Sequence, residues 1–277
     1  MRLRVGAGTD TGRVRDLNED VYVSRADQGL FVVCDGMGGA PAGEVASQVA
    51  AEAIVEQLNR PANGDGRSEN DSRGFLPQTA RLADAVRRSN AIVYHQAQQD
   101  ATQAEMGTTV VGAWIQDQII SVAHVGDSRA YLWHDDRLER LTRDHSLAEA
   151  EVRAGLLERE ESLNSQHQNV LLRAIGREPD VEVDLAEIPV QPGDYLLLCS
   201  DGLTRMVSEM TLARTIDDLR DPQSICDALI HAANRNGGAD NITVIVVEVT
   251  GSWWRQLSSR WKRKTKRGND GEAHSAV

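Results

Sequence analysis

Acidic residues recur at the ends of strand-like segments in this sequence, where their side chains could meet around one cation. Asp35 and Asp201 each follow an apolar run and precede a glycine, which allows a sharp turn. A single Asp-Gly pair is typical of a plain turn, but here the pattern is repeated. We therefore interpret these residues as candidate ligands of one metal site. They are Glu19, Asp20, Asp35, Asp127, Asp201 and Asp240.

The ligand types in this set indicate which cation it would hold. Carboxylates without accompanying His or Cys clusters are typical of sites for hard cations, so magnesium or manganese is expected. The seven histidines show no H-x-H or H-x-x-x-H spacing, which argues against zinc. Two such ions about 4 Å apart, sharing an Asp, would lower the pKa of a bridging water and neutralise a phosphate ester. The expected chemistry is hydrolysis of a phosphoester.

A phosphate monoester also needs a fixed cation that orients it. Arginine suits this role because its planar guanidinium can donate to two phosphate oxygens at once. Arg13 and Arg15 both lie just upstream of Glu19. Either arginine could face the site, and a solvated surface position is the alternative for each.

Size and composition limit the other function classes. A chain of 277 residues can form one large domain with a substantial core. Its net charge of −12 argues against a nucleic-acid partner. The three cysteines form no C-x-x-C pair, so we expect them to pack in the core. The sequence shows no signal-peptide pattern and no long apolar run, which predicts a cytoplasmic protein.

The hydrophobic pattern alternates between strand and helix periods. Strands are expected at 3–10, 20–34, 108–115, 119–125, 129–133, 181–188, 194–199 and 241–249. Helices are expected at 42–58, 78–99, 147–153, 204–217 and 222–234. The strands between 108 and 133 are separated by short polar turns, which predicts an antiparallel meander. Runs of strands with helix pairs between them predict an antiparallel two-sheet core with helices packed outside.

One domain is expected over residues 1–250, followed by a tail at 251–277 of different composition. The tail contains seven basic residues and three tryptophans. A basic amphipathic helix with its tryptophans on one face could lie on an anionic membrane or dock on an acidic partner. A disordered solubilising tail is the equal alternative.

Six short motifs occur in the order in which they occur in a known enzyme family. Together they resemble the type-2C, metal-dependent protein serine/threonine phosphatases, and the bacterial branch most closely. The resemblance spans about residues 5–249 and implies an α+β fold, a central β-sandwich of two antiparallel sheets flanked on both sides by helix pairs. It also implies hydrolysis of phosphoserine and phosphothreonine in proteins, in opposition to a Ser/Thr kinase. The motifs are Arg15–Asp20, Val33–Gly39, Met106–Thr109, Val125–Tyr131, Leu198–Leu203 and Gly238–Thr243.

The resemblance implies roles for the metal ligands. Asp35 would bridge two Mn²⁺ or Mg²⁺ ions and is the central catalytic carboxylate. The Gly36 carbonyl and Glu19 would complete the second ion's site. Asp201 and Asp240 would hold the first ion.

Further positions follow from the same resemblance. Asp20 would bind metal-coordinated water from outside the direct ligands. Asp127, together with Asp201, matches the ligands of a weaker third ion in bacterial members. Arg15, four residues before Glu19, corresponds to the family's phosphate-binding arginine, whereas Arg13 does not.

One position departs from the family pattern. Many animal members have a histidine directly after the Asp-Gly of the second motif, where it is the proposed general acid, and this chain has Met37. The general acid therefore stays unassigned. The polar segment 142–168 corresponds to the family's flap beside the active site, which would influence substrate choice.

Three functions are compatible with these residues. An active, monomeric phosphatase is favoured because every ligand position is acidic. A phosphatase of a sigma-factor cascade would share the fold, but such enzymes usually carry a sensor domain, and the sequence shows none. A docking pseudoenzyme would be indicated by the loss of Asp35, Asp201 or Asp240, and none of them is lost.

Overall fold

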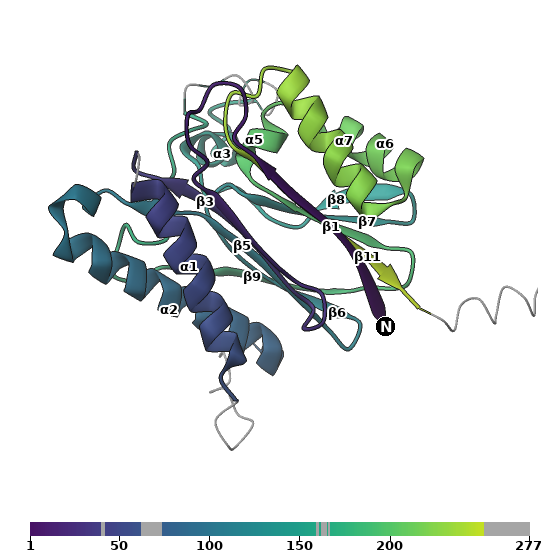
Figure 1. Cartoon of the computed structure of the whole chain (residues 1–277), viewed down its shortest axis with the longest axis horizontal. Helices are drawn as coiled ribbons and strands as arrows, with labels where there is room; N and C mark the ends of the chain where they lie inside the picture. The colour runs from purple at the N-terminus through teal and green to yellow at the C-terminus, as the bar shows by residue number, and fades with distance from the viewer. Residues whose placement is uncertain (40–41, 62–73, 159–160, 162–164, 166, 252–277) are drawn as a thin grey trace, which may run out of the picture.

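The computed structural model describes residues 1–39, 42–61, 74–158, 161, 165 and 167–251. Two antiparallel sheets pack face to face, and a pair of helices covers the outer face of each sheet (Figure 1). The expected fold, a central two-sheet sandwich between helix pairs, is therefore confirmed. Apart from Gly251, the tail 251–277 lies outside the described residues.

The first sheet joins the two ends of the described chain. Its outer face packs against α6 (Glu209–Leu219) and α7 (Pro222–Arg235), whose buried leucines and isoleucines meet Leu197 and Val244. The strand nearest each end of the described chain pairs with the other over nine residues, from Arg2 with Thr250 to Asp10 with Ile242. In spatial order the strands are β1 (Arg2–Asp10), β11 (Ile242–Thr250), β10 (Tyr195–Cys199), β7 (Arg129–His134) and β8 (Arg137–Arg140).

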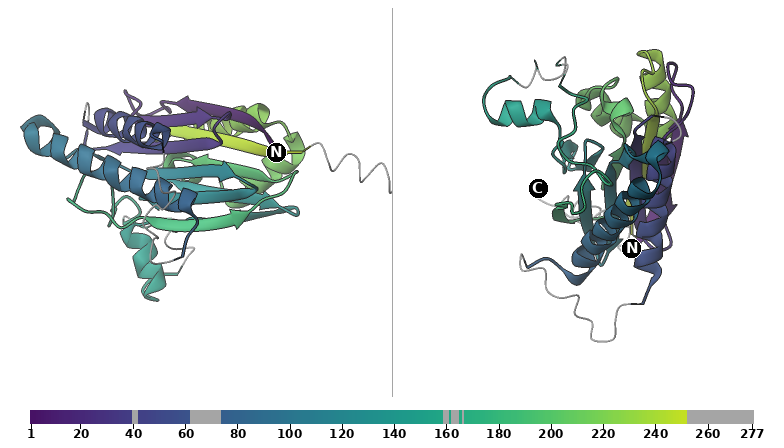
Figure 2. Two further views of the ribbon diagram at one scale, coloured as in Figure 1. Left: turned by 90° about the horizontal axis from the view of Figure 1, so that it is seen from below. Right: turned by 90° about the vertical axis from the view of Figure 1, so that its left-hand side faces the viewer.

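The second sheet packs against α1 (Ala42–Asn59) and α2 (Pro77–Gln99), which lie side by side in Figures 1 and 2. The inner face of α1 is rich in alanine, so the helix approaches the sheet closely. The strands, in spatial order, are β2 (Asp20–Arg25), β3 (Leu30–Met37), β5 (Val110–Gln116), β6 (Ile119–Val125) and β9 (Asp184–Pro189), with β4 (Gly107–Thr108) paired to the end of β3.

Both faces of the central strands are buried, which explains their continuous apolar runs. On β3, Leu30 and Val32 pack against the helices, whereas Phe31 and Val33 pack against the other sheet. Because side chains alternate along a strand, Asp35 lies on the same face as Phe31 and Val33. The register of the strand therefore aims Asp35 at the space between the two sheets.

The expected antiparallel meander over 108–133 is wrong. β5 and β6 pair with each other, but β7 pairs with β10 and β8 in the opposite sheet. The chain changes sheets at Gly126, which has a φ of +111°, and a Cβ there would lie 2.6 Å from Thr109. This left-handed turn redirects the strand away from its neighbour and carries Asp127 between the sheets.

Several element boundaries also differ from the expected ones. The strand expected at 20–34 is a hairpin of β2 and β3 that turns at Gly29, with a φ of +69°. The strand expected at 181–188 is β9, which starts at Asp184. The helix expected at 204–217 is two pieces, α5 (Asp201–Thr204) and α6, because Ser208 caps the second piece by accepting from the Thr211 backbone N–H.

Short elements complete the chain. They are the 3₁₀ turn η1 (Ala101–Gln103) and α3 (Leu147–Arg153), which projects away from the sandwich in Figure 2. The three cysteines are free and buried, as expected from their place in apolar segments. None of the helices in the described ranges has the length and apolarity needed to cross a membrane.

Candidate metal centre

A pocket of about 610 Å³ opens at one end of the sandwich, where both sheets contribute acidic side chains. Its walls include five of the predicted ligands, together with the Gly36 backbone and Arg15. Asp20 lies directly behind them, since it pairs with Asp35 across β2 and β3. The residues from distant motifs are therefore brought together. The five ligands in the wall are Glu19, Asp35, Asp127, Asp201 and Asp240.

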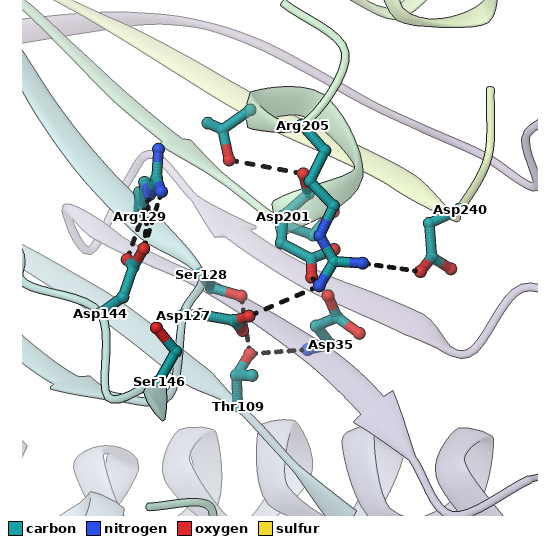
Figure 3. A network of polar contacts seen from close by, with 12 residues as sticks. Asp35, Thr109, Asp127, Ser128, Arg129, Asp144, Ser146, Asp201, Arg205 and Asp240 are labelled. Atoms are coloured by element: carbon teal, nitrogen blue, oxygen red, sulfur yellow. Dashed lines mark hydrogen bonds and ion pairs between the residues drawn. The ribbon is translucent and has the colours of Figure 1, made fainter. Parts of the chain in front are cut away.

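Asp35 is held at the end of the inner face of β3. Its backbone N–H donates to Thr109 Oγ1 at 3.1 Å, and the Thr109 N–H donates to the Asp35 carbonyl at 2.9 Å. Thr109 Oγ1 also lies 2.6 Å from Ser128 Oγ, next to Asp127 (Figure 3). Thr109 therefore links the strand that carries Asp35 to the turn that carries Asp127.

Glu19 and Gly36 approach each other through their backbones. The Gly36 N–H donates to the Glu19 carbonyl at 3.1 Å. A Cβ at Gly36 would lie 2.2 Å from the Gly43 carbonyl oxygen, so only glycine allows α1 to begin this close to β3. The Glu19 N–H donates to Asn241 Oδ1 at 2.8 Å, and Asn241 donates to the Leu17 carbonyl at 2.9 Å. Asn241, which the sequence analysis missed, fixes the loop before β2 against β11.

The Asp20 carboxylate is buried, and only one of its two oxygens accepts a hydrogen bond from a described residue. Ser200 Oγ donates to its Oδ2 at 2.7 Å, while its Oδ1 accepts no hydrogen bond from any described residue. Burial raises the pKa of Asp20 to about 7, and the nearby Asp201 adds to the shift. A carboxylate in this environment needs a positive partner to stay ionised.

Three other aspartates of the pocket, Asp35, Asp127 and Asp201, also have raised pKa values. Burial, followed by the repulsion of neighbouring carboxylates, raises the pKa of Asp35 and Asp127 well above its usual value. The pKa of Asp201 is raised by burial as well, and Asp201 Oδ1 has no hydrogen-bond partner among the described residues. Unpaired, mutually repelling carboxylates fit a bound divalent cation, whose charge would reverse these shifts. As placed, no three Asp, Glu, His or Cys side chains of the described ranges surround one common ion position.

Arg205 is a cation that the structure places inside this cluster, and the sequence analysis missed it. Its guanidinium is ion-paired with Asp201 and lies 3.7 Å from Asp127 and 3.6 Å from Asp240 (Figure 3). The signal in the sequence is the spacing of four residues between Asp201 and Arg205, which places both on one side of a helical turn.

Of the two candidate arginines, Arg15 lines the pocket. Its Nη2 donates to Asp240 Oδ2 at 2.9 Å, and 53 % of its side chain is exposed. Arg13 is not among the residues that line the pocket, and its backbone N–H instead donates to the Gly238 carbonyl. Of these two arginines, Arg15 is therefore the one that lines the pocket.

The turn that carries Asp127 is held by the start of the segment that was expected to form the flap. The Gly126 N–H donates to His145 Nδ1 at 3.1 Å, and the His145 N–H donates to the Gly126 carbonyl at 2.7 Å. Arg129 donates to Asp144 in three hydrogen bonds, two from Nε and one from Nη2, which join β7 to the same segment (Figure 3). The flap thus begins directly beside the candidate ligand Asp127.

The flap also returns to the pocket at its other end. Ser146 and Leu171 form an isolated β-bridge, and Asn169 and Leu171 line the pocket wall. The segment expected at 142–168 therefore extends to about Leu172, whose N–H donates to the His145 carbonyl.

Comparison with known proteins decides the family. Residues 7–241 match the model of the protein phosphatase 2C family. The chain belongs to this family. The serine/threonine phosphatase Stp of Listeria innocua is 38 % identical over 243 residues, covering 87 % of this chain and 93 % of Stp. The serine/threonine phosphatase PstP of Mycobacterium tuberculosis is 34 % identical over 248 residues, covering 89 % of this chain and 45 % of PstP.

Solved structures of phosphatase 2C proteins agree with this architecture. The catalytic domain of PstP in complex with two manganese ions has a TM-score of 0.78 and 32 % identity, covering 90 % of this chain and 99 % of that one. Stp1 of Staphylococcus aureus has a TM-score of 0.80 and 32 % identity, covering 91 % of this chain and 96 % of that one. The expected family, fold and enzyme class, a metal-dependent protein serine/threonine phosphatase of bacterial type, are confirmed.

Proposed function

We propose that this phosphatase 2C chain binds two Mn²⁺ or Mg²⁺ ions in the acidic pocket and hydrolyses phosphoserine and phosphothreonine there. The observation that carries the proposal is the burial of Asp20, Asp127 and Asp201 beside the half-buried Asp35, with few positive groups to balance them. Burying such a group of carboxylates costs free energy unless cations compensate it. The dimanganese structure of the PstP catalytic domain supports the number of ions.

The proposed ligand set divides between the two sheets. Asp35, on the inner face of β3, is proposed to bridge both ions. Asp201 and Asp240, which flank Arg205, are proposed for the first ion, and Glu19 with the Gly36 carbonyl for the second. When bound, the two ions would lower the pKa of a coordinated water and neutralise charge on the phosphate.

Asp20 would act from behind the ligands. Its Oδ2 is held by Ser200, whose Oγ also accepts from the Thr243 N–H at 3.0 Å. Its Oδ1 accepts no hydrogen bond from a described residue, so it could orient a water bound to the metal centre. Asp20 would therefore act on metal-bound water and not on the substrate.

Arg15 is proposed to hold the substrate phosphate. Its exposed guanidinium lies at the edge of the pocket and now donates to Asp240, so turning outward would present two donors to phosphate oxygens. The apolar side chains of Val14, Leu17 and Leu171 line the same pocket and would contact the peptide around the phosphorylated residue. Met37 also lines it but has no proton to donate, so the general acid stays unassigned.

The test is turnover of p-nitrophenyl phosphate and of a phosphothreonine peptide by the full chain with Mn²⁺, with EDTA, and in Asp35→Asn. We expect EDTA to abolish turnover and Asp35→Asn to reduce it at least about 100-fold, because the bridging ligand is lost. Asp84→Asn is the matched control, since Asp84 pairs with Arg87 on the exposed face of α2. No Mn²⁺-dependent turnover would favour the docking pseudoenzyme.

The biological setting stays a prediction. Phosphoproteins are the substrates that the family implies, and a Ser/Thr kinase with its targets is the proposed counterpart. The domain boundary at 250, the monomeric state and the cytoplasmic location are proposals as well. Peripheral contact with an anionic membrane or an acidic partner would depend on the tail 251–277, nearly all of which lies outside the described residues.

A further inference from the structure

Arg205 occupies the place where a third cation would be expected. The family resemblance assigns Asp127 and Asp201 to a third, weaker ion, but in this structure both carboxylates share one guanidinium (Figure 3). Only 24 % of the Arg205 side chain is exposed, so the ion pairs are shielded from solvent. The pocket already contains a fixed positive charge between these two ligands.

We propose that Arg205 replaces a third metal ion in this chain, so that the centre holds two ions and one guanidinium. The inference deepens the proposed function and rests on its two-ion centre. It assigns Arg205 as a positioning residue that fixes Asp127 and one oxygen of Asp201.

The position of Arg205 follows from local backbone structure. The Arg205 N–H donates to the Asp201 carbonyl at 2.9 Å, which closes one helical turn at the end of α5. Residues four apart on such a turn lie on the same side, so the arginine is delivered to Asp201 without any distant contact. Asp127 then meets the same guanidinium because the Gly126 turn crosses between the sheets.

The two carboxylate oxygens of Asp201 could bind different cations, one the Arg205 guanidinium and the other the first metal ion. Asp201 Oδ2 is the atom paired with Arg205, whereas Asp201 Oδ1 is buried and accepts no hydrogen bond from a described residue. Oδ1 is therefore available for the first ion while Oδ2 stays with the guanidinium. The guanidinium also lies 3.6 Å from Asp240 Oδ2, so it borders both proposed ligands of the first ion. Asp201 Oδ1 is the oxygen through which that ion could bind while Arg205 stays in place.

A third divalent ion would have to displace Arg205. Arginine remains protonated at any working pH, so its charge cannot be removed by titration. An ion bound by Asp127 and Asp201 would then lie beside a displaced guanidinium in a poorly solvated pocket, where like charges repel strongly. The permanent charge of Arg205 therefore disfavours binding of a third ion by Asp127 and Asp201.

The experiment counts bound Mn²⁺ on the full chain by electron paramagnetic resonance during titration with Mn²⁺ alone. We expect the wild type to bind two ions and no third up to about 1 mM, the range of weak oxygen-ligand sites. Arg205→Ala should gain a third ion, and Arg205→Asp should bind it at least about tenfold more tightly because a ligand charge is added. Adding Asp127→Asn to Arg205→Asp should remove that ion. Arg60→Ala is the control, since Arg60 pairs with Glu56 four residues earlier on the surface.

Two results would overturn the inference while leaving the proposed function intact. One is a wild type that binds three ions and loses one in Asp127→Asn. The other is an Arg205 variant that is folded by circular dichroism and still binds only two. A wild type that binds no Mn²⁺ would instead overturn the proposed function together with this inference. The wild-type count needs no variant to fold, so the inference can fail on that measurement alone.

Discussion

Two regions on the same face of β3 differ in whether burying their side chains stabilises or destabilises the folded protein. Phe31 and Val33 fill the space between the sheets among apolar side chains from both. Asp35, two residues further along the same face, faces a pocket lined with carboxylates. Burying the first region stabilises the fold by about 25 cal/mol per Å² of apolar surface, whereas burying the second costs free energy. Burial therefore favours the interior, and we expect the pocket end to depend on bound cations.

Substituting one residue in each region should give the largest changes in the free energy of unfolding in EDTA, and the two changes should have opposite signs. Val33→Ala is expected to lower the free energy of unfolding by about 2 kcal/mol, because a fully buried side chain leaves a cavity. Its turnover per folded molecule should stay near that of the wild type. Asp35→Asn should instead raise the unfolding free energy measured in EDTA, because it removes one charge from the cluster.

Urea unfolding of both variants with EDTA and with Mn²⁺ measures this contrast. Mn²⁺ should stabilise the Val33→Ala variant as it does the wild type, since ligand binding to the native state adds stability. It should stabilise Asp35→Asn much less. Destabilisation of both variants by similar amounts in EDTA would mean that the pocket end is packed like the interior.

The stability of the metal-free protein should also depend on pH, because the acidic cluster is buried without a compensating metal ion. This effect should be smaller. The pKa of Asp20 is about 7 in the folded protein, against about 3.9 for an unfolded Asp. Between these values the folded state binds more protons than the unfolded state, so this contribution to stability is lost as pH rises through about 7. The melting temperature in EDTA should therefore fall from about pH 5.5 to about pH 8. Mn²⁺ should weaken or reverse this trend.

Asp20→Asn separates this contribution from the rest of the protein, because the amide does not titrate. Melting curves of the variant in EDTA should depend less on pH over the same range. A wild type that is more stable at the higher pH without metal would contradict the assignment of an uncompensated acidic cluster.

The smallest effect is expected at the clamp on the Asp127 turn. His145 accepts from the Gly126 N–H and lies 3.2 Å from Asp184 Oδ2 through its other ring nitrogen. His145→Ala should loosen this turn and lower kcat on a phosphothreonine peptide about tenfold, as is usual for residues that orient ligands. His95→Ala, on the exposed face of α2, is the control. Equal kcat values in the two variants would remove any role for the clamp.

Much of the fold and the site could be predicted from local sequence patterns. The apolar runs before Asp35 and Asp201 indicated strands, and both lie in the cores of the two sheets. The helices expected at 42–58 and 222–234 have boundaries within one residue of α1 and α7, since their apolar spacing is regular. The motif resemblance then indicated which acidic residues would meet.

The errors occurred where distant segments decide the outcome. The polar turn at Gly126 has the composition of a hairpin turn, but it connects strands of different sheets. Asn241 was missed because its value lies in hydrogen bonds to the loop before β2, more than two hundred residues away in the chain. Composition and periodicity describe burial and turns, and they contain no information on which strands pair.

The sequence by itself determined the ligand types, their order along the chain and the apolar periodicity of the elements that present them. Each of these depends on interactions between residues close together in the chain. The family resemblance had already paired Asp127 with Asp201, but only the tertiary structure showed that Arg205 lies between them. Those contacts depend on the register of two packed sheets, which is set by many weak interactions between distant residues acting together.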